Sequence, residues 1–324
     1  MAAQSAHQHL TPDGAAKRGR SRTLSSGQGL QPALSPTAIR KRLLDPKRLY
    51  LALSVDDLHP KTWGSYWDHF GKRLVELIRI RPGSSVLDVG TGGGASLYPA
   101  AEKIGPRGKV IGIEVCEGCL KRTSAEIERC GISNARLLRM DARNMTFEDE
   151  SFDFVLSGFI GWDDYFDFES CRPIADDVMM SEICRVLRSG GRVGISGWAV
   201  QDESTVLRDL LYEYLPSDSP HRKGIAGWSH RETPEGWQMI LSNAGLAKIK
   251  TFVERYVEIY PSEDAWWSSS FDGDWKQVAE DLARSGVVTI QALRERAFEM
   301  LSRYKRADGI HQVRDAVLAI GTKP

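Results

Sequence analysis

Short apolar runs alternate with amphipathic segments through the middle of the chain. The runs have the length of buried strands and predict strands at Ser85–Val89, Val110–Glu114, Arg136–Met140, Phe152–Ser157 and Arg192–Ser196. Between them, helical periodicity predicts helices near 95–104, 117–130 and 175–188, several of which end at glycine. Strands that alternate with helices form βαβ units, so the pattern predicts a doubly wound, Rossmann-like α/β fold with a parallel sheet.

The flanking regions are mainly helical. Upstream, one apolar stripe predicts a helix that ends at Arg81-Pro82-Gly83, and its members are Trp67, Phe70, Leu74, Leu77 and Ile78. Downstream, a helix begins at Thr233-Pro234, a Trp-rich helical insertion "SEDAWWSSSFDGDW" follows, and Val313–Ile320 predicts a last strand. We therefore divide the chain into N-terminal helices (37–84), an α/β core (85–199), cap helices with a sixth strand near 247–257 (200–310) and the last core strand (311–324).

Residues 1–36 contain no Ile, Val, Phe, Trp or Tyr, which predicts a disordered tail. The chain has no net charge, but residues 1–49 hold nine Lys/Arg and only two Asp/Glu, so the remainder has 34 basic against 41 acidic residues. This acidic body favours a small substrate over nucleic acid. We see no membrane span and no secretory leader, and five scattered cysteines indicate reduced thiols, so we predict a cytoplasmic protein without a metal site.

The stretch "VLDVGTGGGASLYPA" carries the first chemical signal. Gly90-x-Gly92-x-x-Ala95 matches the dinucleotide-binding fingerprint, which by itself is weak because glycines let many ligands approach the backbone. Asp88 argues against a pyrophosphate, since a carboxylate at the end of the first strand repels phosphate and attracts a cationic group. Glu114 and Asp141 end the second and third strands, so three acids face one crevice, which suits an adenosine that carries an amino acid.

These residues resemble the class I S-adenosylmethionine-dependent methyltransferases, in the branch of quinone C-methyltransferases and small-molecule enzymes. "LDVGTGGG" resembles the first motif of that family, and "VIGIEV", "MDARNMTFEDESFDFVL" and "ICRVLRSGGRVGIS" resemble the segments that follow it, with Ser189 where proline is usual. The resemblance covers roughly residues 60–200. It implies a seven-stranded sheet with a reversed last strand and in-line transfer of a methyl group from a sulfonium.

By this resemblance the cofactor is S-adenosylmethionine, with S-adenosylhomocysteine as its product. The predicted cofactor residues lie in the N-terminal helix, the glycine loop and the ends of the second, third and fourth strands; they are Tyr66, Asp88, Gly90, Thr91, Gly92, Gly94, Glu114, Val115, Asp141, Ala142 and Ser157. For Tyr66, helix packing is an equal alternative. Asp141 also suits a turn or a helix cap.

The catalytic group is less clear from the sequence. His230, in "GWSHRE", and Asp163, just beyond the fourth strand, are the candidates for a base, with Asp164 and His69 behind them. Trp266 and Trp267 suit either a helical core or an aromatic lid. The helix from Cys116 to Cys130 repeats its cysteines at helical spacing, which favours core packing over a zinc or redox site.

The expected activity is methyl transfer to a small aromatic or isoprenoid-like acceptor. Three alternatives stay open: an RNA or protein methyltransferase, an NAD-dependent oxidoreductase, and a binding module that has lost transfer. The sequence after the fourth strand, "SGFIGWDD", lacks the Pro-Pro-aromatic motif that positions amino nitrogens in macromolecule methyltransferases. The oligomeric state stays unknown at this point.

Overall fold

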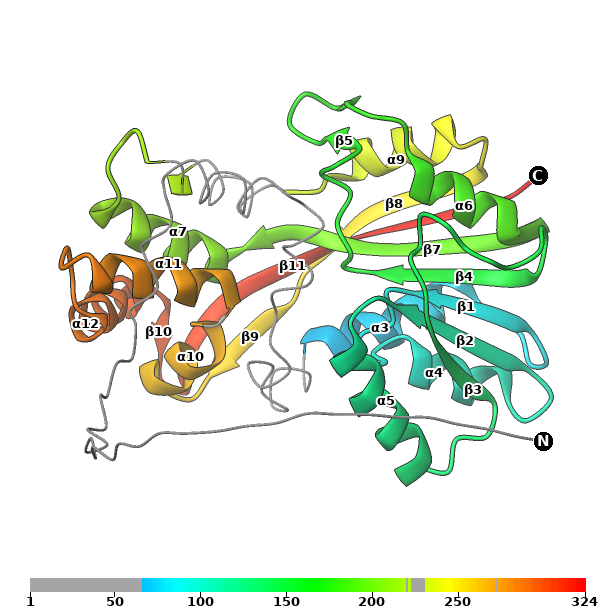
Figure 1. Cartoon of the computed structure of the whole chain (residues 1–324), viewed down its shortest axis with the longest axis horizontal. Coiled ribbons are helices and arrows are strands. Elements are labelled where there is room, and N and C mark those ends of the chain that lie inside the picture. Colours follow the sequence, from blue (N-terminus) through cyan, green and yellow to red (C-terminus); the bar gives the residue numbers. More distant parts are fainter. Residues whose placement is uncertain (1–65, 220, 223–230, 272) are drawn as a thin grey trace, which may run out of the picture.

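The computed structural model describes residues 66–219, 221–222, 231–271 and 273–324, which form a sheet with helices on both faces (Figure 1). The predicted tail, most of the predicted N-terminal helices, Trp228 and the candidate base His230 lie outside the described residues. No helix in the described part of the chain is both long enough and apolar enough to cross a bilayer.

Seven strands form the core sheet in the order β3-β2-β1-β4-β7-β11-β8. The first five are mutually parallel, and β11 runs antiparallel to both β7 and β8. Their bounds are Ser85–Val89 (β1), Lys109–Glu114 (β2), Ala135–Arg139 (β3), Phe152–Gly158 (β4), Leu187–Gln201 (β7), Ala247–Glu254 (β8) and Gly309–Thr322 (β11). The expected seven-stranded sheet with a reversed last strand is confirmed.

Helices cover the sheet on both faces because each presents one apolar stripe (Figure 1). One face carries α3 (Tyr66–Ile78), α4 (Leu97–Ile104) and α5 (Glu117–Arg129), and the other carries α6 (Val178–Val186) and α9 (Pro234–Asn243). The start of α9 follows the predicted chemistry: Thr233 accepts a hydrogen bond from the N–H of Gly236 (3.1 Å), and proline takes the first helical position.

The strands β7 and β11 continue beyond the core into a second unit (Figure 1). There the first part of β11 pairs with β9 (Val257–Tyr260) and β10 (Lys305–Arg306), which brings the sheet to nine strands. Four helices and a 3₁₀ turn build a separate apolar core in this unit: α7 (Asp202–Tyr214), α10 (Glu263–Ser270), α11 (Gly273–Arg284), α12 (Ile290–Leu301) and η1 (Ser302–Tyr304). A two-stranded hairpin, β5 (Phe166–Asp167) with β6 (Arg172–Pro173), lies between β4 and α6.

The Trp-rich insertion belongs to this second core. Trp266 is fully buried and donates a hydrogen bond from Nε1 to Oε1 of Gln312 (2.7 Å), and the Trp267 ring stacks on Phe271 with centroids 4.1 Å apart. Of the two interpretations that the sequence allowed for Trp266 and Trp267, the structure supports the helical core.

The cysteine helix differs from its prediction at its end. Cys119 and Thr123 are buried, and Cys116 caps α5 by accepting from the N–H of Cys119 at 3.2 Å. Cys130, which we placed on the buried face, is exposed at the C-terminal cap of α5, directly after Arg129. All five cysteines are free, and among the described residues no group of three or more His, Cys, Asp or Glu is placed to hold a metal ion.

Candidate functional site

The glycine loop connects β1 to α4 at the carboxyl edge of the sheet. Gly90, Gly92 and Gly94 all have positive φ (67°, 47° and 88°), a conformation that L side chains rarely adopt. Space is also limited: a Cβ on Gly90 would lie 2.3 Å from Cγ2 of Ile160, and one on Gly94 would lie 2.6 Å from the Tyr98 ring. The loop therefore needs glycine both for its turn and for its close packing.

Asp88 lies beneath this loop. Its side chain is 2% exposed, and its Oδ2 accepts a hydrogen bond from Oγ1 of Thr91 at 2.6 Å. Burial raises the pKa of the Asp88 carboxyl to about 7, the Thr91 hydrogen bond opposes that rise, and the nearby charge of Glu114 adds to it. The structure thus gives Asp88 a direct part in holding the loop, while its predicted contact with a ligand remains a prediction.

Glu114 connects the end of β2 to the glycine loop. Its Oε2 accepts from the N–H of Gly92 (3.1 Å), and its Oε1 accepts from the N–H groups of Val115 (2.8 Å) and Cys116 (2.9 Å). Thr123 of α5 secures the same loop by donating to the carbonyl of Gly92 (2.7 Å). The Glu114 carboxylate therefore holds one backbone amide of the glycine loop and two of the segment that follows β2.

The three acids end three neighbouring strands, as the sequence indicated, but their side chains do not share one environment. β1, β2 and β3 are adjacent, and the N–H of Met140 bonds to the carbonyl of Glu114 (3.1 Å), which sets Asp141 beside the end of β2. The Asp141 carboxylate pairs with the guanidinium of Arg143 (2.7 Å) at a largely exposed position. Asp88 and Glu114 thus act on each other, and Asp141 lies at the rim.

The other predicted cofactor residues lie in different surroundings. Ala142, at the rim, packs partly against the main core. Ser157, in β4, is fully buried, and its hydroxyl has no hydrogen-bond partner among the described residues. Tyr66 is 1% exposed: its hydroxyl accepts from Nε2 of Gln201 (3.2 Å), and the guanidinium of Arg314 lies 4.3 Å from its ring. The structure gives Tyr66 a packing role, and its contact with the cofactor remains a prediction.

Of the candidate bases, Asp163 and Asp164 are exposed in the segment that follows β4. His69 lies on α3 with Nε2 3.9 Å from Oε1 of Glu254, and its ring lies beside Tyr256. Its described partners therefore lie on α3, on β8 and at Tyr256, and none of them belongs to the glycine loop.

An aromatic wall, which the sequence did not single out, stands where β4 ends and β7 continues past it, with one member on α3. We use this name for Trp67, Phe159 and Trp198; the Phe159 centroid lies 4.9 Å from that of Trp67 and 5.5 Å from that of Trp198. Phe159 holds a positive φ of 53°, fixed by a 2.7 Å hydrogen bond from its N–H to the carbonyl of Ser196. Such strain in a non-glycine residue clusters at ligand sites. The next residue, Ile160, is the one that contacts Gly90, so the wall adjoins the glycine loop.

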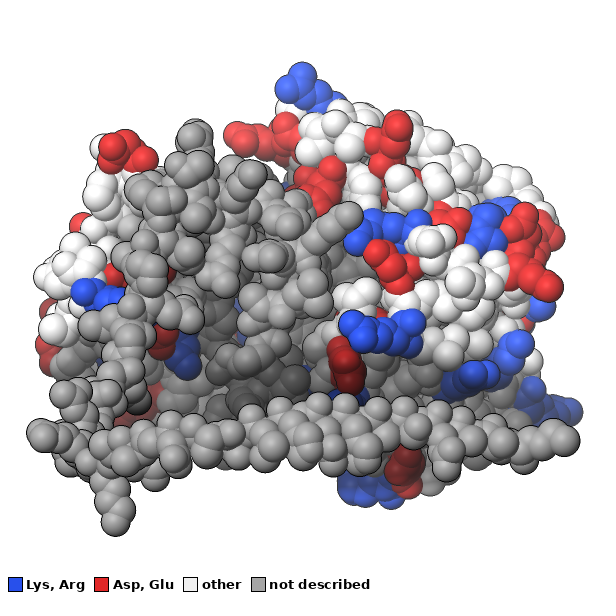
Figure 2. Space-filling model, in the orientation of Figure 1, with Lys and Arg blue, Asp and Glu red and all other residues white. Residues whose placement is uncertain are grey.

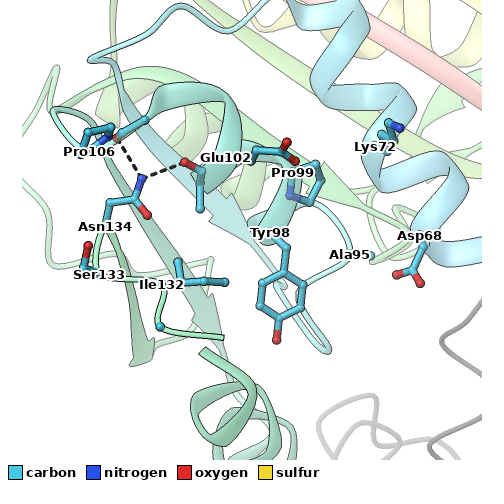
Figure 3. Close-up of a pocket in the computed structure, with 13 residues that line it drawn as sticks. Asp68, Lys72, Ala95, Tyr98, Pro99, Glu102, Pro106, Ile132, Ser133 and Asn134 are labelled. Carbon is cyan, nitrogen blue, oxygen red and sulfur yellow. Dashed lines mark hydrogen bonds between the residues drawn. The ribbon is translucent and has the colours of Figure 1, made fainter. Parts of the chain in front are cut away.

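A separate cavity of about 660 Å³ runs along the outer side of α4 (Figure 3). Tyr98 and Pro99 line it from α4, and Asn134 closes one end by donating from Nδ2 to the carbonyls of Ala101 (2.8 Å) and Gly105 (2.9 Å). Neither Asp88 nor Glu114 lines this cavity. The convergence of acids therefore marks the loop, and not the cavity, as the candidate cofactor site.

The chemistry of the loop suits a cationic nucleoside better than a dinucleotide. Two neighbouring carboxyl groups disfavour a phosphate chain, since the negative charge of Glu114 already contributes to the raised pKa of Asp88. A carboxylate at the end of the second strand suits the hydroxyls of a ribose. The residues present thus fit S-adenosylmethionine, and the aromatic wall beside them suits an apolar acceptor.

Replacing Gly90 with alanine is expected to weaken S-adenosylhomocysteine binding by about tenfold or more, because the Cβ forces either Ile160 or the turn to move. Isothermal titration measures the effect. Gly105→Ala is the matched control: Gly105 has a similar φ of 66° but open space around its Cα, so it should lose stability and keep its affinity. Equal losses of affinity in the two variants would contradict this explanation.

The known proteins that this chain resembles are methyltransferases. A family model described as a methyltransferase domain matches residues 80–245, just over half of the chain. The chain is similar to nocamycin O-methyltransferase of Saccharothrix syringae, with 27% identity over 254 residues that cover 74% of this chain and 86% of that relative. It is 38% identical over 191 residues to aklanonic acid methyltransferase DauC of Streptomyces sp. (strain C5), covering 59% and 77% of the two chains. Demethylmenaquinone methyltransferase of Listeria monocytogenes is 31% identical over 136 residues, covering 39% and 53%.

Proposed function

The chain belongs to the methyltransferase-domain family and is an S-adenosylmethionine-dependent methyltransferase of class I; from this premise, we propose that it methylates a small aromatic or isoprenoid-like acceptor. The assignment of the methyl donor rests on the two neighbouring acids Asp88 and Glu114 at the glycine loop. The proposed class of methyl acceptor rests on the aromatic wall beside that loop.

For the donor, we propose that Glu114 binds the ribose hydroxyls and that Asp141 and Ala142 border the adenine. Asp88 and Thr91 keep the loop in shape, and the backbone of Gly90, Gly92 and Gly94 lies against the amino-acid end. When bound, S-adenosylmethionine supplies a methyl group on a positively charged sulfur. Tyr66, Val115 and Ser157 complete the proposed set, and the orphaned hydroxyl of Ser157 supports it because a buried polar group without a partner is rare.

For the acceptor, this chain's contribution is alignment and exclusion of water. The aromatic wall offers flat apolar surface where β4 ends beside β7, which favours a planar or isoprenoid acceptor. The relatives' names agree in class, since they specify nocamycin, aklanonic acid and demethylmenaquinone chemistry. The role of Asp163 or His230 as a catalytic base remains a prediction.

We propose further that nucleic acid is not a substrate and that the enzyme works in the cytoplasm. On the part of the face that Figure 2 shows uncovered, acidic and basic side chains are interspersed. A nucleic-acid enzyme typically gathers basic side chains in a patch or stripe. The five free cysteines support a reducing compartment.

Isothermal titration with S-adenosylhomocysteine tests the donor, and NADH serves as the control ligand. We expect heat from the first and none from the second. Turnover with aklanonic acid and demethylmenaquinone, compared with total RNA and a histone mixture, tests the acceptor class. Absence of heat with S-adenosylhomocysteine discards the donor assignment, and transfer to RNA or histone alone discards the acceptor class.

A further inference from the structure

Glu232 carries a buried carboxyl group that the proposed function has not used. It is 3% exposed and directly precedes the Thr233 cap of α9. Its backbone N–H donates to the carbonyl of Trp198 (2.8 Å), and its Oε2 accepts from Nε1 of Trp237 (2.7 Å). Its Oε1 is buried and has no hydrogen-bond partner among the described residues. Half of this carboxyl group is therefore unsatisfied.

The carboxyl group fills a notch in β7 that exists only because residue 197 is glycine. A Cβ on Gly197 would lie 1.7 Å from Oε2 and 2.5 Å from Cδ of Glu232. Gly197 follows Ser196, which pairs with Gly158, the last residue of β4. The notch thus lies at the carboxyl edge of the sheet, where ligands bind in open α/β folds. It also adjoins Trp198 of the aromatic wall.

Packing alone does not explain this arrangement. A glutamine could keep an acceptor for the Trp237 indole without burying a group that can ionise. Buried polar atoms without partners are uncommon in folded proteins, and a catalytic role is one of the explanations for such an exception.

The surroundings of Glu232 set its ionisation. Burial raises the pKa of the Glu232 carboxyl to about 8, the Trp237 indole opposes that rise, the exposed Asp163 carboxylate adds to it, and the Trp198 backbone lowers it. Burial above all raises the pKa of the Tyr66 phenol on α3, and the charge of the nearby Glu232 adds a smaller rise. In its ionised form, which becomes the major form above about pH 8, this carboxylate is basic enough to accept a proton from a phenol or an enol.

We propose that Glu232 is the proton acceptor of the methyl-acceptor site and that the acceptor carries an acidic O–H group, as a phenol or an enol does. This rests on the proposed function. The O–H bond breaks, its proton moves to Oε1, and its electron pair remains with the acceptor. An electron pair of the acceptor forms the new bond to the methyl carbon, while the pair of the broken sulfur–carbon bond stays on sulfur, which becomes neutral. The proton leaves Glu232 for water after product release.

The test compares Glu232→Gln with the matched control Glu235→Gln, an exposed acid three residues away in the first turn of α9. For Glu232→Gln we expect kcat/KM for aklanonic acid or demethylmenaquinone to fall by about 100-fold or more. The Kd for S-adenosylhomocysteine should stay within about twofold, because binding of the donor does not need this proton acceptor. Glu235→Gln should leave both values unchanged.

Stability gives a readout that is independent of turnover. The unfolded chain loses this proton near the ordinary pKa of glutamate, and the folded chain holds it until about pH 8. The native state therefore loses stability as pH rises between those two values. Glutamine cannot ionise, so Glu232→Gln should raise Tm by about 4 °C or more at pH 9 and change it little at pH 4. The Trp237 indole reports the same titration, so an inflection in tryptophan fluorescence near pH 8 should disappear in the variant.

A variant that is less active and more stable at high pH supports the proposal. If Glu232→Gln is more stable but keeps kcat/KM within about threefold, the carboxyl group is only structural and the proposal fails. If Glu232→Gln does not fold, Gly197→Ala decides, since its Cβ displaces the carboxyl group without removing it; full activity in that variant overturns the proposal.

The wild-type protein separates failure of this proposal from failure of the proposed function. If the wild type binds S-adenosylhomocysteine but methylates neither acceptor, the proposed acceptor class is wrong, and the proposal for Glu232 is wrong with it. If S-adenosylhomocysteine does not bind, the proposed function itself fails.

Discussion

Replacing Arg314 with methionine should lower the free energy of unfolding by about 3–5 kcal/mol, the cost typical of removing one partner from a buried ion pair. Arg314 lies in β11, where this strand leaves the core, and its guanidinium lies 3.3 Å from Glu203 of α7 and 3.6 Å from Glu258 of β9. All three side chains are at most 16% exposed. Without the arginine, two buried acids lose the positive charge that lies between them.

Urea unfolding measures this loss, and Arg296→Met serves as the control. Arg296 also pairs with a glutamate, Glu213, at 2.8 Å, but both side chains are more than a third exposed. Exposed pairs contribute no more than about 1 kcal/mol, so Arg296→Met should change little. Adding Glu203→Gln and Glu258→Gln to Arg314→Met should recover most of the loss. A loss below about 1 kcal/mol in the single variant would show that this buried network contributes little to stability.

The core sheet could be predicted from the sequence because burial on both faces leaves a plain signal. All five residues of β1 are buried, so "SVLDV" shows a short apolar run and no alternation. The sequence did not predict the end of β7, because that part of the strand leaves no such plain apolar signal. Beyond Ser196 the strand no longer pairs with β4 but continues along β11 as far as Gln201, and its composition there is mixed. Pairing between distant segments, not local preference, extends this strand.

For the site, residue positions could be predicted from the sequence, but side-chain directions could not. Strand ends placed Asp88, Glu114 and Asp141 correctly on one edge of the sheet, since parallel strands share that edge. Their side-chain directions could not be predicted, because they depend on the hydrogen bonds and the ion pair that Thr91, Gly92 and Arg143 make with the three carboxylates. Sequence order alone carries no information on those contacts.

Glu232 left no sequence signal that points to function. An acid just before Thr233-Pro234 is typical of a helix start, where it favours the positive end of the dipole. His230, two residues earlier, attracted the prediction of a base because its ordinary pKa suits that role. The notch at Gly197 and the contact with Trp237 arise only when β7 and α9 pack together. Burial, which changes an ordinary acid into a weak one, is a property of the fold.

Replacing Glu114 with glutamine should raise the Kd for S-adenosylhomocysteine by about 100-fold, which corresponds to about 2.7 kcal/mol. The carboxylate holds the amides of Gly92, Val115 and Cys116, and in the proposed complex it also binds the ribose. A glutamine amide group cannot accept from these N–H groups with both of its ends, so either the loop or the sugar loses a charge-assisted hydrogen bond. Isothermal titration at fixed pH and salt measures the change.

Asp141→Asn is the control that separates this effect from general loss of negative charge. Asp141 is at the rim and already paired with Arg143, so its replacement should raise the Kd by less than about tenfold. Neutralising Glu114 also removes its charge from the neighbourhood of Asp88, which should lower the Asp88 pKa. A Kd within about threefold of wild type in Glu114→Gln would show that the donor binds elsewhere, because no other described carboxylate joins β2 to the glycine loop.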